Sequence, residues 1–176
     1  MTNDTAHMAR AAHLAGDGAA PVIYRDTVQA DWVDYNGHLR DAFYMLIYSY
    51  ATDALLDAIG LDAAQRTARG RSMYTLEAHL NYLHEIKEGA QVRVEVRVLE
   101  HDAKRVRAYL EMFADEGALP VSASEQLLLH VDRSGPRAAA FDADVLARVA
   151  ALCAASAGFT PHHAARAIAL APRPGR

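Results

Sequence analysis

The sequence is poor in cysteine, has no excess of positive charge and contains no long hydrophobic run. Cys153 is the only cysteine in 176 residues, which excludes an internal disulfide and a cysteine-rich zinc site and makes the cytoplasm the expected compartment. The 18 basic and 22 acidic residues give a net charge of −4, which argues against general nucleic-acid binding. No stretch reaches the roughly 18 to 20 uncharged apolar residues that span a bilayer, and residues 1–20 hold no apolar signal core. We therefore expect a protein that binds neither nucleic acid nor membrane.

Several motifs of catalysis and cofactor binding are also missing. The sequence has no GxSxG nucleophile elbow and no P-loop, and Gly16-Asp-Gly18 lacks the third glycine of a dinucleotide site. His79 and His84 do not have the spacing of a zinc-binding helix. We predict neither a metal nor an organic cofactor.

The length fits one domain of ordinary size. Composition and pattern divide the chain into a mobile N-terminal arm (1–20), an ordered domain (21–156) and a C-terminal tail (157–176). Alternating apolar and polar residues predict strands, and a long apolar stretch that Asp41 caps and Gly60 ends predicts a helix. The predicted strands are residues 22–30, 73–82, 92–98, 105–114 and 121–132, the predicted helices are 41–59 and 142–156, and 61–71 is predicted to be a loop.

The order of these elements favours an α+β fold, with an antiparallel sheet of about five strands wrapped around one long helix. The polar residues of that helix fall on one narrow stripe, so most of its circumference is expected to be buried. The stripe consists of Ser49, Thr52, Asp53 and Asp57. In the strand 73–82, strict alternation is expected to place five side chains on one face, namely Tyr74, Leu76, Ala78, Leu80 and Tyr82.

The densest group of polar and special residues, Asp31 to Asp41, lies between the first strand and the long helix. A helix start presents free backbone N–H groups and a positive dipole end, which suit a developing oxyanion. The carboxylate of Asp34 can act there as a nucleophile or a general base. A structural interpretation remains open, in which Asp34 and Asn36 bond their own backbone in a turn before the helix.

Aromatic residues gather around the same loop. Trp32 and Tyr35 lie in the loop, and Tyr44, Tyr48 and Tyr50 follow in the first turns of the helix. Core packing is the alternative explanation for the helix tyrosines, whereas it explains the two loop residues less well.

Residues 28–38, VQADWVDYNGH, followed by Tyr44 and the long helix, resemble the hotdog-fold acyl-CoA thioesterases of the 4-hydroxybenzoyl-CoA thioesterase type. The resemblance continues through SMYTLEAHLNY (72–82), LEHDAKR (99–105) and SEQLLLHVD (124–132), and it covers about Val22 to Leu152. Within that family the sequence is most similar to the betainyl-CoA thioesterases, including those fused to carnitine dehydrogenases.

The resemblance implies a hotdog fold, an acyl-CoA substrate, no cofactor and a homodimer with active sites at the subunit interface. It places the catalytic carboxylate on Asp34 and the backbone N–H that binds the oxyanion at about Asp41. Asn36, Gly37 and His38 match the family's loop, whereas Arg40 stands where a small polar residue is more usual.

Betainyl-CoA carries a trimethylammonium group, which aromatic faces bind well. The candidate walls are Trp32, Tyr35, Tyr44, Tyr48, Tyr74 and Tyr82, with Glu77 as the candidate counter-charge. In the alternative interpretation these rings are ordinary core and the enzyme prefers neutral acyl or aryl chains.

Two other activities of the fold remain open at this stage. The first is a non-catalytic module that binds acyl-CoA. The second is a hydratase, which requires Asp34 and His38 to converge on one carbon atom. Release of free CoA from a panel of acyl-CoA substrates, measured beside hydration, separates all three activities.

Overall fold

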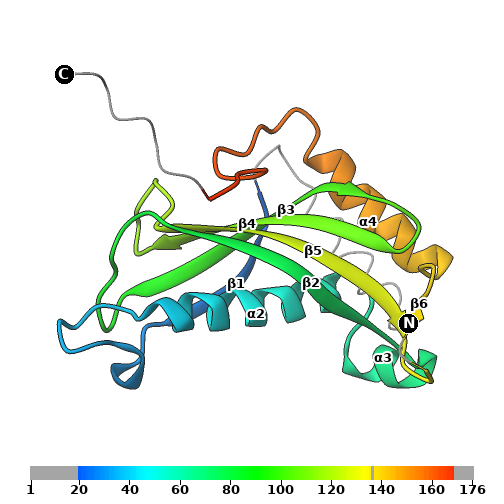
Figure 1. The fold of residues 1–176 in the computed structure, drawn as a ribbon, viewed down its shortest axis with the longest axis horizontal. Coiled ribbons are helices and arrows are strands. Elements are labelled where there is room, and N and C mark those ends of the chain that lie inside the picture. The colour runs from blue at the N-terminus through cyan, green and yellow to red at the C-terminus, as the bar shows by residue number, and fades with distance from the viewer. Residues whose placement is uncertain (1–19, 136, 169–176) are drawn as a thin grey trace.

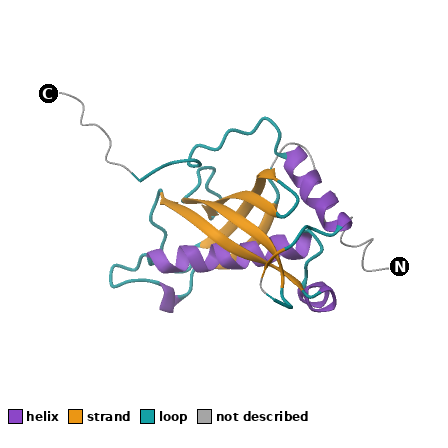
Figure 2. Cartoon of the chain, turned by 45° about the vertical axis from the view of Figure 1, so that its right-hand side comes forward, coloured by secondary structure: helices purple, strands orange, loops and turns teal. Residues whose placement is uncertain are grey.

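The computed structural model of the chain describes residues 20–135 and 137–168. One antiparallel sheet curls around a long helix, in the strand order β1-β3-β4-β5-β2, with the short β6 paired to β5 (Figures 1 and 2). The predicted α+β hotdog architecture is therefore confirmed. The strands are β1 (Val22–Thr27), β2 (Arg71–Tyr82), β3 (Gln91–His101), β4 (Arg105–Ala114), β5 (Ser122–Asp132) and β6 (Arg137–Ala138), and the helices are the 3-10 turn η1 (Ala30–Trp32), α2 (Asp41–Ala58), α3 (Ala63–Arg69) and α4 (Ala143–Ala155).

The inner face of the sheet, which packs against α2, is apolar because strand alternation sorts the side chains. The valines at 92, 94, 96 and 98 of β3 are buried, whereas the charged residues between them point to the outer face and are half-buried. From α2, Ile47, Ala51 and Leu55 contribute to the same core and are almost fully buried. The long helix and the sheet therefore share one hydrophobic core.

The ends of α2 differ in part from the prediction. Gly60 follows the helix with φ of +86°, a conformation that glycine adopts without strain, as predicted. Arg40, not Asp41, occupies the N-cap position and makes no side-chain cap. Asp41 lies in the first turn instead, where its carboxylate accepts a hydrogen bond from the N–H of Ala42 at 2.8 Å.

Two parts of the predicted secondary structure were wrong. The predicted loop 61–71 contains the helix α3, because the Asp62 side chain caps its start by accepting from the N–H of Gln65 at 2.8 Å and Gly70 ends it. The first strand ends at Thr27 instead of residue 30, since the chain turns into η1 before the catalytic candidates.

A β-bulge in β2 overturns the expected alternation of that strand. Thr75 pairs with Leu128 and Glu77 pairs with Leu127, so Leu76 is an extra residue without its own partner in β5. After this extra residue, each side chain of β2 lies on the face opposite to the one that strict alternation predicts. Tyr82, opposite the buried Ser122, belongs to the inner face, whereas Tyr74, opposite Leu129, belongs to the outer face.

The described part of the predicted tail, residues 157–168, crosses the outer face of the sheet (Figure 1). The Phe159 ring lies 4.1 Å from the guanidinium carbon of Arg97 and 5.9 Å from the ring centre of Tyr109. Further along, the N–H of Ala165 donates to Glu125 at 2.6 Å. The predicted N-terminal arm lies outside the described residues except for Ala20, and so does the tail after residue 168.

A helix that is both long and apolar enough for a bilayer does not occur within residues 20–135 and 137–168.

Candidate active site

The loop before α2 is organised by the carboxylate of Asp34. Its Oδ1 accepts hydrogen bonds from the N–H groups of Asn36 at 2.8 Å and His38 at 3.1 Å. The backbone closes the same turn, because the N–H of Asp34 donates to the carbonyl of His38 at 2.8 Å and Gly37 takes φ of +77°. The structural interpretation of Asp34 is thus correct for Oδ1. Its second oxygen, Oδ2, has no hydrogen-bond partner in the described part of the chain.

This arrangement keeps Asp34 ionised. The N–H of His38, assisted by that of Asn36, donates to the carboxylate and lowers the pKa of Asp34 below its ordinary value. Electrostatic interactions with His38 and Arg40 act in the same direction. A half-exposed carboxylate therefore stands before the buried helix, charged and with one oxygen free.

The connection between β2 and β3 braces the loop from the other side. The N–H of Leu39 donates to the carbonyl of Ile86 at 2.8 Å, and His38 forms an isolated bridge with Lys87. The His38 ring carries its Nδ1 3.5 Å from Oε2 of Glu85. These contacts fix the loop although it contains no regular strand.

Two aromatic pairs flank the first turn of α2. Trp32 stacks on Phe43 with ring centres 5.6 Å apart, and Tyr44 meets Tyr82 edge to face at 5.3 Å. The Tyr82 hydroxyl lies 3.5 Å from the carbonyl oxygen of Asp41. Burial raises the pKa of Tyr82, and the nearby carboxylate of Asp41 raises it further. Strand β2 thus brings a tyrosine, 55 % exposed, to the helix start.

Three of the predicted binding residues lie elsewhere. Tyr48 is fully buried and donates to Ser122 at 3.0 Å, so it fixes α2 on β5 and lines no surface. Tyr74 and Glu77 lie on the outer face of β2, since their partners there are Leu129 and Leu127. A fourth, Tyr35, stays in the candidate loop but lies at its tip and is 95 % exposed.

Sequence reasoning missed three contributors to this region. Phe43 supplies the stacking partner of Trp32. The backbone carbonyl of His84 accepts a hydrogen bond from the Tyr44 hydroxyl at 3.2 Å, and Glu85 faces His38. The position of Phe43 in the first turn of the helix could have indicated that its ring lies near the loop. The other two contacts join residues about 40 or more positions apart, and nothing local in the sequence indicates them.

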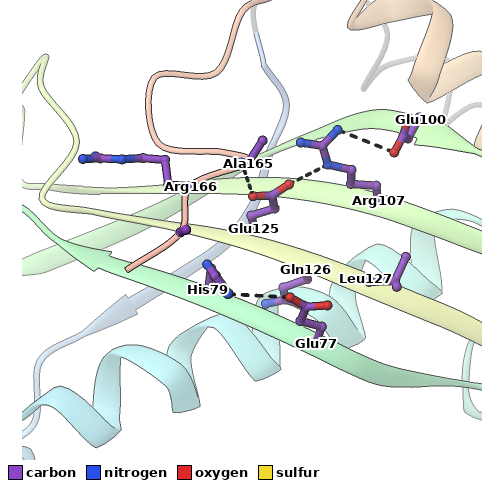
Figure 3. A pocket seen from close by; sticks show the side chains of 10 residues that line it. Glu77, His79, Glu100, Arg107, Glu125, Gln126, Leu127, Ala165 and Arg166 are labelled. Atoms are coloured by element: carbon purple, nitrogen blue, oxygen red, sulfur yellow. Dashed lines mark hydrogen bonds and ion pairs between the residues drawn. The ribbon is translucent and has the colours of Figure 1, made fainter. Parts of the chain in front are cut away.

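A cavity of about 470 Å³ opens on the outer face of the sheet beneath the C-terminal segment (Figure 3). Its charged groups are largely occupied with one another: Arg107 lies 2.5 Å from Glu125, and His79 lies 3.6 Å from Glu77. Because the sheet separates it from the helix start, this cavity is not the candidate active site. Within the described residues, no group of three or more His, Cys, Asp or Glu could hold a metal ion.

Comparisons with known proteins agree with this architecture. Residues 28–149 match the model of the thioesterase-like superfamily. The chain is 51 % identical over 150 residues to the betainyl-CoA thioesterase of Pseudomonas aeruginosa, covering 85 % of this chain and 94 % of that protein. It is 41 % identical over 146 residues to the L-carnitine dehydrogenase/betainyl-CoA thioesterase of Agrobacterium fabrum, covering 83 % of this chain and 30 % of that longer protein.

Solved structures show the same fold. The crystal structure of a candidate thioesterase from Pseudomonas putida KT2440 superposes with a TM-score of 0.76 at 45 % identity, over 88 % of this chain and 99 % of its own. A hypothetical protein of Staphylococcus aureus, solved in complex with CoA, superposes with a TM-score of 0.80 at 24 % identity, over 86 % of this chain and 97 % of its own. The chain belongs to the thioesterase-like superfamily of hotdog proteins and is a thioester hydrolase.

Proposed function

We propose that this enzyme hydrolyses betainyl-CoA to glycine betaine and CoA in the breakdown of carnitine, with Asp34 as its catalytic carboxylate. The observation that carries the proposal is the ionised Asp34, with Oδ2 free, directly before the buried helix of a chain that is 51 % identical to a betainyl-CoA thioesterase. We propose a cytoplasmic location, because CoA thioesters are made and used inside the cell.

The chemistry requires a group that attacks or activates water and a donor for the thioester oxygen. Asp34 supplies the first. The N–H of Asp41 supplies the second, because it belongs to the first turn of α2 and makes no hydrogen bond to a described residue. In the reaction the C–S bond breaks, the oxygen of water joins the acyl carbon and a proton goes to the CoA sulfur. Direct attack by Asp34 and activation of water by Asp34 both require the carboxylate to be ionised.

Asp34→Asn tests the site. Asparagine keeps an oxygen that can accept from Asn36 and His38, so the turn and the fold are retained. We expect kcat for CoA release from betainyl-CoA to fall by about 100-fold or more, the scale of a positioned acid or base. Asp53→Asn, an exposed aspartate in the middle of α2, is the matched control. Near-normal turnover in a folded Asp34→Asn protein would contradict the assignment.

We propose further that the enzyme is a homodimer joined along β2. This strand is at the end of the sheet order and pairs only with β5 in the chain described here. It also exposes three large apolar side chains, Tyr74, Leu76 and Tyr82. An unpaired edge of this kind favours pairing with a second copy.

A further inference from the structure

The acyl group of betainyl-CoA places its charge very close to the reacting carbon. The trimethylammonium nitrogen and the thioester carbon are joined through one CH₂ group, so they lie about 2.5 Å apart, as do the amide nitrogen and carbonyl carbon of one residue. The residue that balances this charge must therefore lie beside the catalytic groups. Glu77, on the outer face of the sheet, does not meet this condition.

Electrostatics at the helix start favours such a counter-charge. The N-terminus of α2 carries a partial positive charge that suits the oxyanion but repels a cation held two bonds from the thioester carbon. The guanidinium of Arg40 is also nearby, although its Nε is held by the carbonyl of Val33 at 2.9 Å. Asp34 is also negative there, but its carboxylate is used on the reacting carbon. A second negative side chain at the same end of the helix therefore favours binding of a cationic acyl group.

Asp41 is the carboxylate in that position. Its side chain is exposed in the first turn of α2, and Oδ1 accepts only the local N–H of Ala42 in the described structure. Its Oδ2 has no hydrogen-bond partner among the described residues. In β2, Tyr82 reaches the same turn with its hydroxyl 3.5 Å from the Asp41 carbonyl oxygen, and its ring packs against that of Tyr44 at an interplanar angle of 84°.

We propose that the Asp41 carboxylate and the Tyr82 ring together bind the ammonium group of the substrate, and that they determine the preference for cationic acyl groups. The inference rests on the proposed function and gives Asp41 a second role, because its N–H serves the oxyanion while its side chain serves the cation. A trimethylammonium group donates no conventional hydrogen bond, so a carboxylate at close range and an aromatic face are the groups suited to it. Asp34 remains the catalytic carboxylate and Asp41 is the specificity-determining residue.

The test compares betainyl-CoA with tert-butylacetyl-CoA, in which carbon replaces the ammonium nitrogen at the same size. The measured quantity is the ratio of kcat/KM for the cationic substrate to kcat/KM for the neutral one. We expect Asp41→Asn to lower this ratio by about tenfold, whereas Asp53→Asn on the exposed face of α2 and Glu77→Gln on the outer face leave it at the wild-type value. Asp41→Glu, which keeps the charge, should restore most of the preference.

A second pair of variants tests the ring. Tyr82→Phe keeps the aromatic face and should keep the ratio, whereas Tyr82→Leu keeps much of the bulk and should lower it severalfold. If Asp41→Asn turns over neither substrate, the two Tyr82 variants decide. Equal kcat/KM ratios in Tyr82→Phe and Tyr82→Leu then overturn the proposal. An unchanged ratio in an active Asp41→Asn enzyme, or a fall of the ratio in Glu77→Gln instead, also overturns it.

These outcomes are distinct from a failure of the proposed function itself. That function fails if the wild-type enzyme does not hydrolyse betainyl-CoA or if Asp34→Asn retains full turnover. The inference about Asp41 fails by itself when the wild-type enzyme hydrolyses betainyl-CoA without preferring it to the neutral substrate. It also fails by itself when any of the contrary results given above for the variants is obtained.

Discussion

At the scale of single residues, Asp34 combines a structural and a proposed catalytic task in one carboxylate, and its ionisation predicts the pH dependence. The N–H of His38 lowers its pKa, so the ionised form persists below the ordinary value of 3.8 and is lost only as the pH falls through the lowered pKa. We expect kcat/KM to stay constant from pH 7 to about pH 5 as far as Asp34 determines it. Initial rates of CoA release, with circular dichroism to verify folding, test this. An acidic limb with a midpoint above pH 5 would assign the essential base to another group.

Gly60 is a second position where one residue has a large effect. A Cβ added there would lie 1.8 Å from Nη1 of Arg148, and φ of +86° disfavours any other side chain. Arg148 is buried and donates to the carbonyl of Ile59 at 3.2 Å, so it has little room to move. We expect Gly60→Ala to lower the free energy of unfolding by about 2 to 4 kcal/mol, measured by urea denaturation. Gly89→Ala shares the positive φ but has an open environment and should lose only about 1 kcal/mol; equal losses would show that the contact with Arg148 is unimportant.

At the scale of elements, Phe159 helps to hold the C-terminal segment 157–168 on the outer face of the sheet. Its ring covers Arg97 and lies beside Tyr109, which is only 1 % exposed. We expect Phe159→Ala to cost about 1 to 3 kcal/mol, because it removes apolar burial and a cation–π contact. Thermal unfolding measures the loss. Ile168→Ala is the control, since Ile168 is 99 % exposed and should change the stability by less than about 0.5 kcal/mol.

At the scale of the whole molecule, the unpaired edge of β2 predicts the oligomeric state. Leu76, the bulged residue, is 54 % exposed in a strand where the chain itself provides no cover. We expect a dimer at micromolar concentration, and we expect Leu76→Glu to raise the monomer fraction at least tenfold because it places charge on the shared edge. Sedimentation velocity measures both. Leu119→Glu, in the exposed connection between β4 and β5, should leave the dimer intact. A wild-type monomer with full activity would refute the dimer.

Local sequence patterns were sufficient to predict the main strands and the long helix of this protein. The alternation of Val92 to Val98 predicted β3, and the apolar stretch ended by Gly60 predicted α2, because both signals depend only on neighbours along the chain. The density of special residues around Asp34 indicated the candidate site for the same reason, since Asp34 bonds to residues two and four positions away.

Only the tertiary structure decided which of the candidate residues lie at the site. The bulge at Leu76 depends on how β2 pairs with β5, and it moves Tyr74 and Glu77 to the face opposite Tyr82. The burial of Tyr48 depends on Ser122, which lies 74 residues further along the chain. Periodicity specifies which side chains share a face only while the count of residues per strand is regular. One extra residue reverses the faces, and the bulge is defined by how the strand pairs with its partner, which alternation within the strand does not reveal.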